Sequence, residues 1–597
     1  MSSPKDSPSN DPPSQARGSK SPSAMNGKLF PQQTYVSQPL TVKRKKRWHA
    51  IALSFAALLW ITSTSHYVSR IQHRATLPGL NLRSYPGEKI KWSPCGEIND
   101  HEVECSDINV PMDQFNATNS GDKTFNIPLI RLRGKNATQN VLLNPGGPGG
   151  SGFGFLYELG SELNTIVGEN FHLLSFDPRG VNSSTPLASC YPDEETKTKF
   201  HYNRDDDVVR DSGKRHAWST NYAKACAENM GEHGKYVNTP QTAADMNSIL
   251  DALGQRDMVY WGFSYGTLLG QTYATMFPER SKRVIIDGVA NQFEWYEAHI
   301  LEMDFVDTFK VIDGFFDECL KAGGDCPLAS FAKTTAELKG KISGITSQLH
   351  DEPISVYKDP STYGTIDANN FLIDGFFRAT YAPKGWPKFA QTLANLLNGN
   401  ATDALLAFTF STFAKIKGDS TDIITLNDGI SGAKYWAQGH QAYNDKMQPF
   451  YRNLSFAATL SRQYGAKQQW AIPRTHNYIP QKGVKTTHPL LILSTTYDPV
   501  CSLTAARTAN EAFVDSRLVE LKAYGHCSLA MPSLCIVKHV RNFLRDGSMP
   551  PEGATCEMDG SYFGKEDGKV EKRGDGGDGK ILEAQERIAE KMRWVLP

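Results

Sequence analysis

The sequence lacks any excess of charge, and it also lacks the closely spaced cysteine pairs that are typical of metal sites. Its 597 residues include 64 lysines and arginines against 64 aspartates and glutamates, so its charge gives no reason to expect nucleic-acid binding. None of its ten cysteines forms a C-x-x-C pair, and we expect neither a metal nor another cofactor. The chain has no internal repeat, and its length suits one large domain with an insertion.

Long apolar runs are also scarce, with one exception near the N-terminus. Residues 1–42 have few large apolar side chains, so we expect 1–47 to be a disordered tail. Five basic residues at its end precede the apolar segment 48–68, which can span a membrane. This order predicts a signal anchor and a type II single-pass membrane protein, with the larger domain lumenal or extracellular. Cleavage near Ser63–Ser65 is the alternative and would give a secreted protein.

All the cysteines and all the glycosylation sequons follow this apolar segment, which suits an oxidising compartment. Local spacing suggests four disulfides: Cys95–Cys105, Cys190–Cys226, Cys319–Cys326 and Cys535–Cys556. We expect Cys501 and Cys527 to form a fifth bridge, with two free thiols as the alternative. The sequons that predict a glycoprotein are at Asn116, Asn136, Asn182, Asn400 and Asn453.

A serine between two glycines is the most informative motif of the chain. Ser264 lies in the pattern G-x-S-x-G, after the apolar run 258–261 and before a segment of helical composition. Strand, sharp turn and helix in this order form the nucleophile elbow of α/β-hydrolases. Gly262 and Gly266 would allow the backbone to turn tightly. The sequence therefore predicts Ser264 as a nucleophile.

Two candidate partners of Ser264 follow later strands. Asp498 comes after the continuous apolar run 490–495, and His526 comes after the predicted strand 517–521. Their chain order, serine then aspartate then histidine, is the order of α/β-hydrolases. We expect His526 to act as general base and Asp498 to orient its imidazole.

A glycine-rich stretch supplies candidates for an oxyanion hole. Asn144 to Gly152 read NPGGPGGSG and follow a short apolar strand. Backbone N–H donors aimed at a developing oxyanion lower the barrier by about 3–4 kcal/mol each. We assign these donors to Gly147 and Tyr265. A phosphate-binding loop is excluded, because the stretch lacks a GK[ST] ending and a dinucleotide fingerprint completed by a downstream acid.

The spacing of apolar runs predicts the fold class α/β, an α/β-hydrolase with a mostly parallel sheet flanked by helices. Residues 88–290 and 486–563 would form the core, 291–485 an inserted helical cap and 564–597 a charged tail, which itself contains an amphipathic stretch at 581–594. The insertion is too long for a loop. The expected strands are 89–92, 103–110, 125–131, 141–144, 172–176, 258–261, 284–287, 490–494 and 518–521.

Five motifs of the chain resemble one family: NPGGPGGSG, FDPRG, GFSYGT, YDPV and GHCS. They are similar to motifs of the proline iminopeptidase and tripeptidyl-aminopeptidase-like serine α/β-hydrolases. Ser533–Cys556 resembles the C-terminal segment of that family, and the resemblance spans 88–563. It implies that Asp177 and Arg179 are architectural supports near the active-site mouth. Asn182 and Ser183 depart from the family pattern.

The resemblance implies an exopeptidase that releases short fragments from peptide N-termini. An esterase, thioesterase or amide hydrolase acting on a small metabolite is the alternative, and the third class is a catalytically dead, membrane-anchored binding protein. An aminopeptidase must bind an α-ammonium group, for which we expect Glu294 and Glu297, with Glu302 and Asp304 as further candidates. The expected partners are a peptide or small acyl substrate and the membrane, and no nucleic acid.

Overall fold

The computed structural model describes residues 87–202, 208–408, 418–453, 461–564 and 577–595. The chain divides into two compact units, Met1–Asn81 and Leu82–Pro597, and every described residue belongs to the second. The expected tail 1–47 and signal anchor 48–68 lie outside the described residues. Within the described ranges, no helix is both long enough and apolar enough to cross a membrane.

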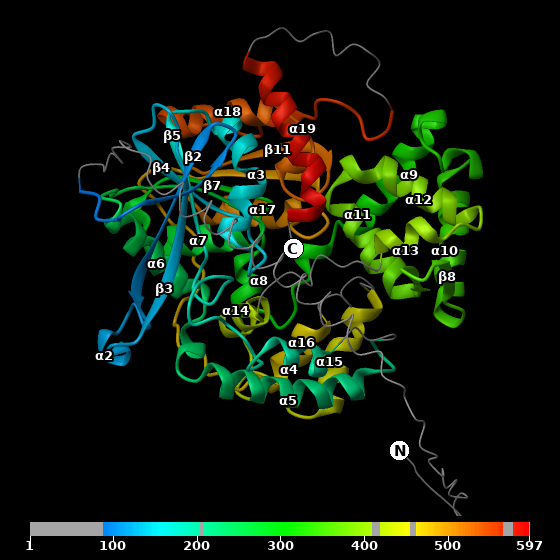
Figure 1. Cartoon of the computed structure of the whole chain (residues 1–597), viewed down its shortest axis with the longest axis horizontal. Helices are drawn as coiled ribbons and strands as arrows, with labels where there is room; N and C mark the ends of the chain where they lie inside the picture. Colours follow the sequence, from blue (N-terminus) through cyan, green and yellow to red (C-terminus); the bar gives the residue numbers. More distant parts are fainter. Residues whose placement is uncertain (1–86, 203–207, 409–417, 454–460, 565–576, 596–597) are drawn as a thin grey trace, which may run out of the picture. The chain divides into compact units, whose positions relative to one another are not determined.

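A ten-stranded sheet forms the centre of this unit, in the order β1-β2-β3-β5-β4-β6-β7-β10-β11-β12 (Figure 1). The strands from β5 to β12 pair in parallel, and β1, β2 and β3 form an antiparallel edge. Their bounds are β1 (Ser93–Ile98), β2 (His101–Pro111), β3 (Thr124–Leu132), β4 (Gln139–Asn144), β5 (Phe171–Phe176), β6 (Met258–Phe263), β7 (Ser281–Asp287), β10 (Leu491–Tyr497), β11 (Arg517–Tyr524) and β12 (Thr555–Glu557). The predicted fold class is confirmed.

Helices cover both faces of the sheet. Val141 and Leu143 of β4 enter one hydrophobic cluster, and Leu142 between them enters another, because successive side chains of a strand point to opposite faces. The first face packs against α3 (Gly152–Val167), α18 (Leu534–Asp546) and α19 (Gly577–Val595). The second packs against α6 (Thr239–Ala252), α7 (Tyr265–Met276) and α17 (Leu503–Ala512). Burial on two sides explains why the central strands read as continuous apolar runs.

One expectation about the chain ends differs from the structure, and another agrees with it. Residues 89–92 form no strand, although Ile90 and Trp92 are buried, because the backbone there bonds to α6 (Lys89 N to Ala252 O, 2.7 Å) and not to a strand. The amphipathic stretch expected at 581–594 within the charged tail lies in the helix α19. Its apolar side is buried and its charged side faces outward, which gives the composition of a tail to a helix that packs on the core.

The insertion between β7 and β10 is largely helical, as expected of a cap. It contains α8 (Gln292–Glu297), α9 (Thr308–Ala322), α10 (Thr335–Asp351), α11 (Arg378–Tyr381), α12 (Trp386–Leu397), α13 (Thr402–Phe408), α14 (Ser420–Asp428), α15 (His440–Asn453) and α16 (Ser461–Gln469). An antiparallel hairpin, β8 (Ile354–Asp359) and β9 (Thr362–Ile366), was not expected. Helices α15 and α16 pack against α5 (Ser212–Met230), which belongs to a second insertion, between β5 and β6 (Figure 1).

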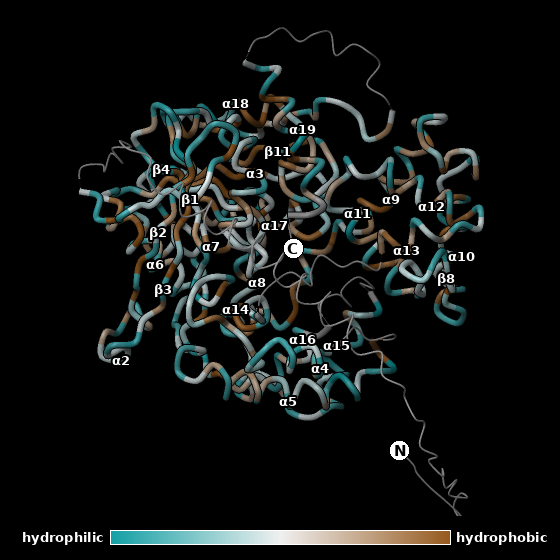
Figure 2. Tube along the Cα trace, viewed as in Figure 1, coloured by the Kyte–Doolittle hydropathy of each residue, from teal (hydrophilic) through white to brown (hydrophobic). Residues whose placement is uncertain are grey.

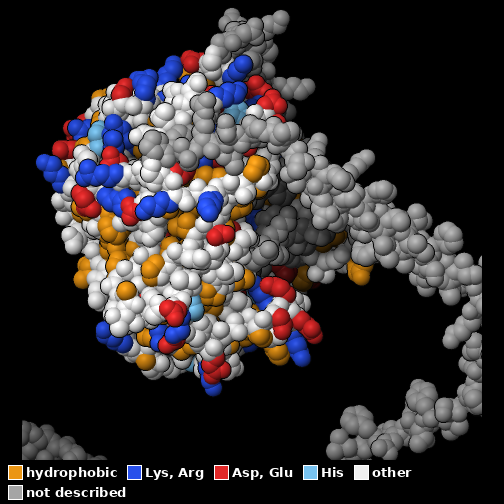
Figure 3. Space-filling model, turned by 60° about the vertical axis from the view of Figure 1, so that its left-hand side comes forward, with side chains coloured by type: hydrophobic (Ala, Val, Ile, Leu, Met, Phe, Trp, Pro, Cys, Tyr) orange, Lys and Arg blue, Asp and Glu red, His pale blue; other side chains and the backbone are white. Residues whose placement is uncertain are grey.

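Apolar and charged residues separate between interior and surface. Figure 2 shows hydrophobic segments along the central strands and within the group of α9, α12 and α13. Figure 3 shows basic and acidic side chains intermixed on one face of the molecule, which agrees with the equal numbers of the two charges.

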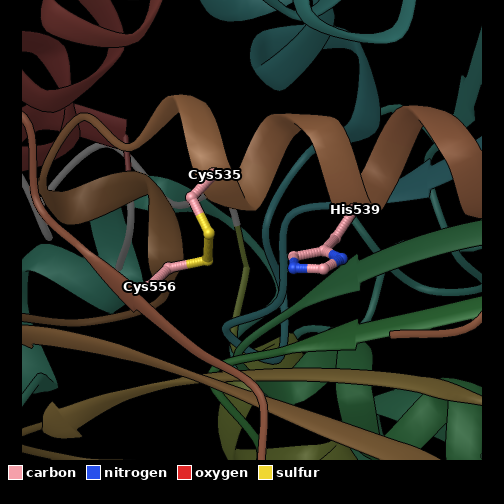
Figure 4. Close-up of side chains that lie close together, drawn as sticks. All are labelled: Cys535, His539 and Cys556. Atoms are coloured by element: carbon pink, nitrogen blue, oxygen red, sulfur yellow. A yellow bond between two sulfur atoms is a disulfide. The ribbon is translucent and has the colours of Figure 1, made fainter. Parts of the chain in front are cut away.

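The four disulfides suggested by local spacing are present: Cys95–Cys105, Cys190–Cys226, Cys319–Cys326 and Cys535–Cys556. Figure 4 shows the bridge between Cys535 of α18 and Cys556 of β12, with His539 beside it. Both sulfurs are used in the bridge, so this group offers no thiolate to a metal ion. Disulfides of this kind are typical of extracellular and secreted proteins.

Candidate active site

Ser264 stands at a sharp turn between β6 and α7. Its backbone has φ 56° and ψ −126°, a conformation that non-glycine residues seldom adopt. A Cβ at Gly262 would come within 2.4 Å of Gly266 O, and a Cβ at Gly266 within 2.7 Å of Asn144 O. Only glycine fits at these two positions, because the helix starts so close to the strand. The turn is the elbow that the motif predicts.

The loops after β10 and β11 bring Asp498 and His526 together. The Nδ1 atom of His526 is 2.9 Å from both carboxylate oxygens of Asp498, and both side chains are buried. The carboxylate also accepts backbone N–H groups from Val500 (3.0 Å), Cys501 (2.9 Å) and Cys527 (2.9 Å). The aspartate is therefore fixed by its own loop and by the histidine loop at once.

The other ring nitrogen of His526 is not paired. Its Nε2 atom is buried and has no hydrogen-bond partner among the described residues, so it forms no bond to the Ser264 hydroxyl in this state. Two contacts place Ser264 beside both loops. The Cys501 thiol contacts the side chain of Ser264, and the Cys527 thiol contacts its backbone. Tyr381 of the cap covers the imidazole, with ring centroids 5.1 Å apart.

The glycine-rich stretch after β4 presses against the elbow. A Cβ at Gly146 would come within 2.4 Å of Phe263 O and 3.0 Å of Tyr265 N. The N–H of Gly146 is occupied by Asn144 Oδ1 (3.0 Å). The N–H groups of Gly147 and Tyr265 donate to no acceptor within the described part of the chain. Sequence reasoning missed Gly146, although its position in NPGGPGG could have indicated a close approach.

Two parts of the chain match families of known proteins. Residues 139–318 match the family described as alpha/beta hydrolase fold, and residues 455–556 match the family described as TAP-like protein. The chain thus has an α/β-hydrolase domain and a TAP-like C-terminal segment. The family resemblance predicted from the five motifs is confirmed.

Relatives of this hydrolase align over most of its length. It is 27% identical over 500 residues to "Serine protease Hip1" of Mycobacterium tuberculosis, covering 79% of this chain and 91% of that protein. It is 25% identical over 494 residues to "Tripeptidyl aminopeptidase" of Streptomyces lividans, covering 78% and 86%. It is 24% identical over 495 residues to "Carboxylesterase B" of Mycobacterium tuberculosis, covering 78% and 89%.

Two carboxyl groups of the hydrolase lie near the acid loop, at the start of the insertion. Glu294 is half-buried and accepts the N–H of Met303 (2.9 Å), and Asp304 is buried and accepts the N–H of Asn291 (3.2 Å). Burial raises the pKa of both groups, and the carboxylates of Glu294 and Asp498 raise the pKa of Asp304 further. Glu294, a predicted binding residue, and Asp304 therefore form one group.

The other two acidic candidates are exposed. Glu297 is exposed at the end of α8, and its role as a binding residue stays a prediction. Residues 294 and 297 are one helical turn apart, but α8 is only six residues long and buries Glu294 while Glu297 remains in solvent. Glu302 is exposed as well.

A buried aspartate that the sequence did not indicate supports the histidine loop. Asp287 ends β7 and accepts the N–H (2.7 Å) and the hydroxyl (2.6 Å) of Ser528, two residues after His526. Its carbonyl also accepts the N–H of Ser264 (3.0 Å). Burial raises the pKa of Asp287 to about 6. The position of Asp287 at the end of a predicted strand, directly before Gly288, is the sequence feature that could have indicated its role.

The hypothesis that Cys501 and Cys527 form a bridge is wrong, because both are free thiols. Their sulfurs have different neighbours. Cys501 lies among Asp498, His526 and the Ser264 side chain. The sulfur of Cys527 packs on Gly288, where an added Cβ would come within 2.4 Å of it. Burial raises the pKa of both thiols, so they remain neutral at ordinary pH.

The FDPRG motif is hydrogen-bonded to the glycine-rich stretch and to α6, and its place near the active-site mouth stays what the resemblance implies. Asp177 accepts the Ser151 hydroxyl (2.8 Å) and the Asn182 amide (2.8 Å). Arg179 is fully buried and bonds to Asp245 through Nε (2.7 Å). Within the described residues, the structure gives no contact between either side chain and the reacting atoms.

The sequons differ in how accessible they are. Asn116, Asn136 and Asn400 are exposed, so their amides can accept a glycan. The amide of Asn182 is half-buried and donates to Asp177 and Ser151, and a glycan there would replace one of the two N–H hydrogens that make these bonds. The structure thus argues against Asn182 as a glycosylation site. The side chain of Asn453 lies outside the described residues.

Proposed function

We propose that this hydrolase is a serine exopeptidase that releases short fragments from peptide N-termini through an acyl-enzyme. The observation that carries the proposal is the state of His526. Asp498 holds its Nδ1 at 2.9 Å, which leaves the unpaired Nε2 free to accept a proton beside the Ser264 elbow. An oriented base next to a strained serine is the arrangement that activates a hydroxyl nucleophile.

The chemistry then follows in two halves. The Nε2 atom of His526 takes the proton from Ser264 as the serine oxygen bonds to the scissile carbonyl carbon, and Asp498 stabilises the imidazolium. The imidazolium gives that proton to the leaving amine as the C–N bond breaks. Water enters, loses a proton to His526 and attacks the ester, and the serine oxygen leaves with the proton.

The tetrahedral oxyanion formed in each half requires donors that are already in place. The N–H groups of Gly147 and Tyr265 fill this role, since they have no other acceptor in the described part of the chain. The close fit of Gly146 on the elbow keeps the two donors near Ser264. One such donor is worth about 3–4 kcal/mol of the barrier.

Recognition of a free N-terminus falls to Glu294 and Asp304. Both carboxyl groups have a raised pKa because of burial, and Asp304 also because of its acidic neighbours. An ammonium ion placed between them would offset that repulsion and favour the ionised forms. The distance from these groups to the nucleophile would then limit how many residues the released fragment contains.

Two measurements test this function. A fluorophosphonate should label Ser264 in the wild type and nothing in Ser264→Ala, as found by peptide mapping. A set of peptides that differ only in a free or acetylated N-terminus should then show cleavage of the free forms alone. Cleavage of both forms at equal rates would overturn the exopeptidase assignment.

An esterase or amide hydrolase of small metabolites is the second candidate, and the similarity to "Carboxylesterase B" favours it. The same peptide set separates the two functions when short acyl esters without an amine are added. An enzyme that hydrolyses these esters with a higher kcat/KM than any peptide is an esterase. The phosphonate label at Ser264 is expected in either case.

We further propose that the catalytic unit is lumenal or extracellular and tethered by the segment 48–68. Its four disulfides support an oxidising compartment. An anchored enzyme should stay with membranes in alkaline carbonate and resist protease in sealed vesicles, and glycosidase should lower its mass. A soluble chain that begins near residue 66 would show that the segment is a cleaved signal.

A further inference from the structure

Helix α14 of the insertion contacts the glycine-rich stretch at its first end and, at its last end, Thr239, whose hydroxyl is hydrogen-bonded to Tyr265. It spans Ser420–Asp428, and eight of its nine residues are buried. This burial means that α14 packs against other segments over almost its whole length. Its two ends meet segments that are far apart in the sequence, the glycine-rich stretch and the N-terminus of α6.

The first end of α14 lies against the glycine-rich stretch. The Thr421 hydroxyl donates to the carbonyl oxygen of Pro148 (2.6 Å), the residue after the proposed donor Gly147. A Cβ at Gly149 would come within 2.7 Å of Ser420 Oγ and 2.8 Å of Thr421 Oγ1. The helix therefore touches this stretch at Gly149 at a distance that only glycine permits, whereas the elbow touches it at Gly146.

The last residue of α14 binds the start of α6. The Asp428 carboxylate accepts the N–H (2.8 Å) and the hydroxyl (2.5 Å) of Thr239, and the indole N–H of Trp295 (2.9 Å). Asp428 is fully buried, and burial raises its pKa to about 6. These contacts join the insertion to the core at one buried point.

Tyr265, the other proposed oxyanion donor, is also hydrogen-bonded to Thr239. This bond joins the hydroxyls of the two side chains. Because Thr239 gives its single proton to Asp428, the Tyr265 hydroxyl must be the donor to Thr239. A directed chain thus runs from Tyr265 through Thr239 to Asp428, and it fixes the side chain of the residue whose backbone N–H faces the reaction.

We propose that α14 sets the distance between the two oxyanion donors, with Thr421 and Asp428 as positioning residues. The inference rests on the proposed function, since it takes Gly147 and Tyr265 as the donors. Neither positioning residue touches the substrate. Each acts through a neighbour of a donor, Pro148 for Gly147 and Thr239 for Tyr265.

The same helix offers a matched control. Asp422 is also a buried aspartate of α14, but its carboxylate accepts the Tyr222 hydroxyl (2.7 Å) of α5, away from the elbow. A change of Asp422→Asn removes the same charge from the same helix. It should therefore reproduce any effect that comes only from weakened packing of α14.

The test compares Asp428→Asn with Asp422→Asn in the full-length enzyme. For Asp428→Asn we expect kcat to fall about tenfold or more, with KM within about twofold, since complete loss of one oxyanion donor costs 10²–10³ in kcat. The inhibition constant of a peptide boronic acid, which forms a tetrahedral adduct on the serine, should rise by the same factor. Asp422→Asn should change neither quantity, whatever its melting temperature.

If Asp428→Asn fails to fold, pairs of Val and Ser variants at Thr239 and at Thr421 test each contact separately. Thr239→Val and Thr421→Val should lower kcat, while Thr239→Ser and Thr421→Ser keep the hydroxyl and should restore it. Equal kcat in the Val and Ser variants would overturn the positioning role, as would an Asp428→Asn enzyme no slower than Asp422→Asn.

Phosphonate labelling of the wild type separates the two levels of the argument. If Ser264 is not labelled, the proposed function fails and the positioning role with it. If Ser264 is labelled but Asp428→Asn has the same kcat as Asp422→Asn, and the Val variants the same kcat as the Ser variants, only the positioning role fails.

Discussion

The core and the insertion of this hydrolase place their polar residues by different means. In the core, Asp287 ends β7 and Asp498 directly follows β10, so the parallel sheet itself brings them to one edge. In the insertion, Asp428 is held by Thr239, 189 residues away, and Asp304 by Asn291, 13 residues away, through contacts outside the sheet. Residues of the first kind should govern the chemistry, and those of the second kind should govern recognition and alignment.

The largest effect that separates the two regions is expected at the nucleophile. Ser264→Ala should lower kcat by about 10⁴- to 10⁶-fold, because members of a triad act as a unit. The far-ultraviolet circular dichroism and the melting temperature should stay close to those of the wild type. Residual activity within tenfold of the wild type would mean that the core does not carry the chemistry.

A smaller and more selective effect is expected in the insertion. Asp304→Asn and Glu294→Gln should each lower kcat/KM for peptides with a free N-terminus by about 10- to 100-fold, since one partner of a charge pair is lost. The same variants should hydrolyse an acetylated or ester substrate, where the wild type does so, at an unchanged rate. Glu297→Gln, which alters an exposed carboxylate, is the matched control and should change neither. A uniform loss on all substrates would place these two residues with the chemistry of the core.

The core aspartate Asp287 should make stability depend on pH in a particular direction. Its pKa is raised from 3.8 to about 6 by burial, so between these values the native state holds a proton that the unfolded state has lost. Stability from this group is therefore present at low pH and is lost as pH rises through about 6. Relative to Asp287→Asn, the free energy of unfolding of the wild type should fall by on the order of 2–3 kcal/mol from pH 4 to pH 7. Urea titrations of both proteins at several pH values measure this difference, and a constant difference would show that Asp287 is ionised throughout.

The smallest effect is expected at the hairpin of the insertion, far from any contact with the site that the structure gives. Tyr357 and Tyr363 are 71% and 68% exposed, and their rings face each other across β8 and β9 at 6.4 Å. Tyr357→Ser should cost less than about 1 kcal/mol, the value of a cross-strand pair, and leave kcat unchanged. Chemical denaturation and steady-state kinetics check both points. A loss of activity here would show that the whole insertion, and not α14 alone, aligns the active site.

Much of the core was predictable because its residues follow local rules. The elbow around Ser264 is encoded by two glycines that only a tight turn requires, and apolar runs mark the buried parallel strands. Asp498 and His526 could be placed because each follows such a strand. The four disulfides were found because each joins cysteines at most 36 residues apart. Residues 89–92 were wrongly predicted as a strand, because residues that are buried without strand pairing can show the same apolar pattern as a strand.

The roles within the insertion could not be predicted in this way. Asp428 and Thr239 are 189 residues apart, and nothing near either residue in the sequence indicates that they meet. The same applies to Glu294 and Glu297, which are alike in type but differ in exposure because the short helix α8 buries one of them. The two thiols near the triad were wrongly paired because nearness of backbones does not set the direction of side chains.

The sequence by itself determined the α/β sheet, the elbow and the three residues proposed for the chemistry, since strand ends and tight turns depend on short segments of chain. Only the tertiary structure decided which carboxylates are buried near the site, that Cys501 and Cys527 remain free thiols, and that α14 contacts both the glycine-rich stretch and Thr239. These outcomes depend on packing between distant segments, where burial, and not residue type, sets the charge state and the hydrogen-bond partners of a side chain.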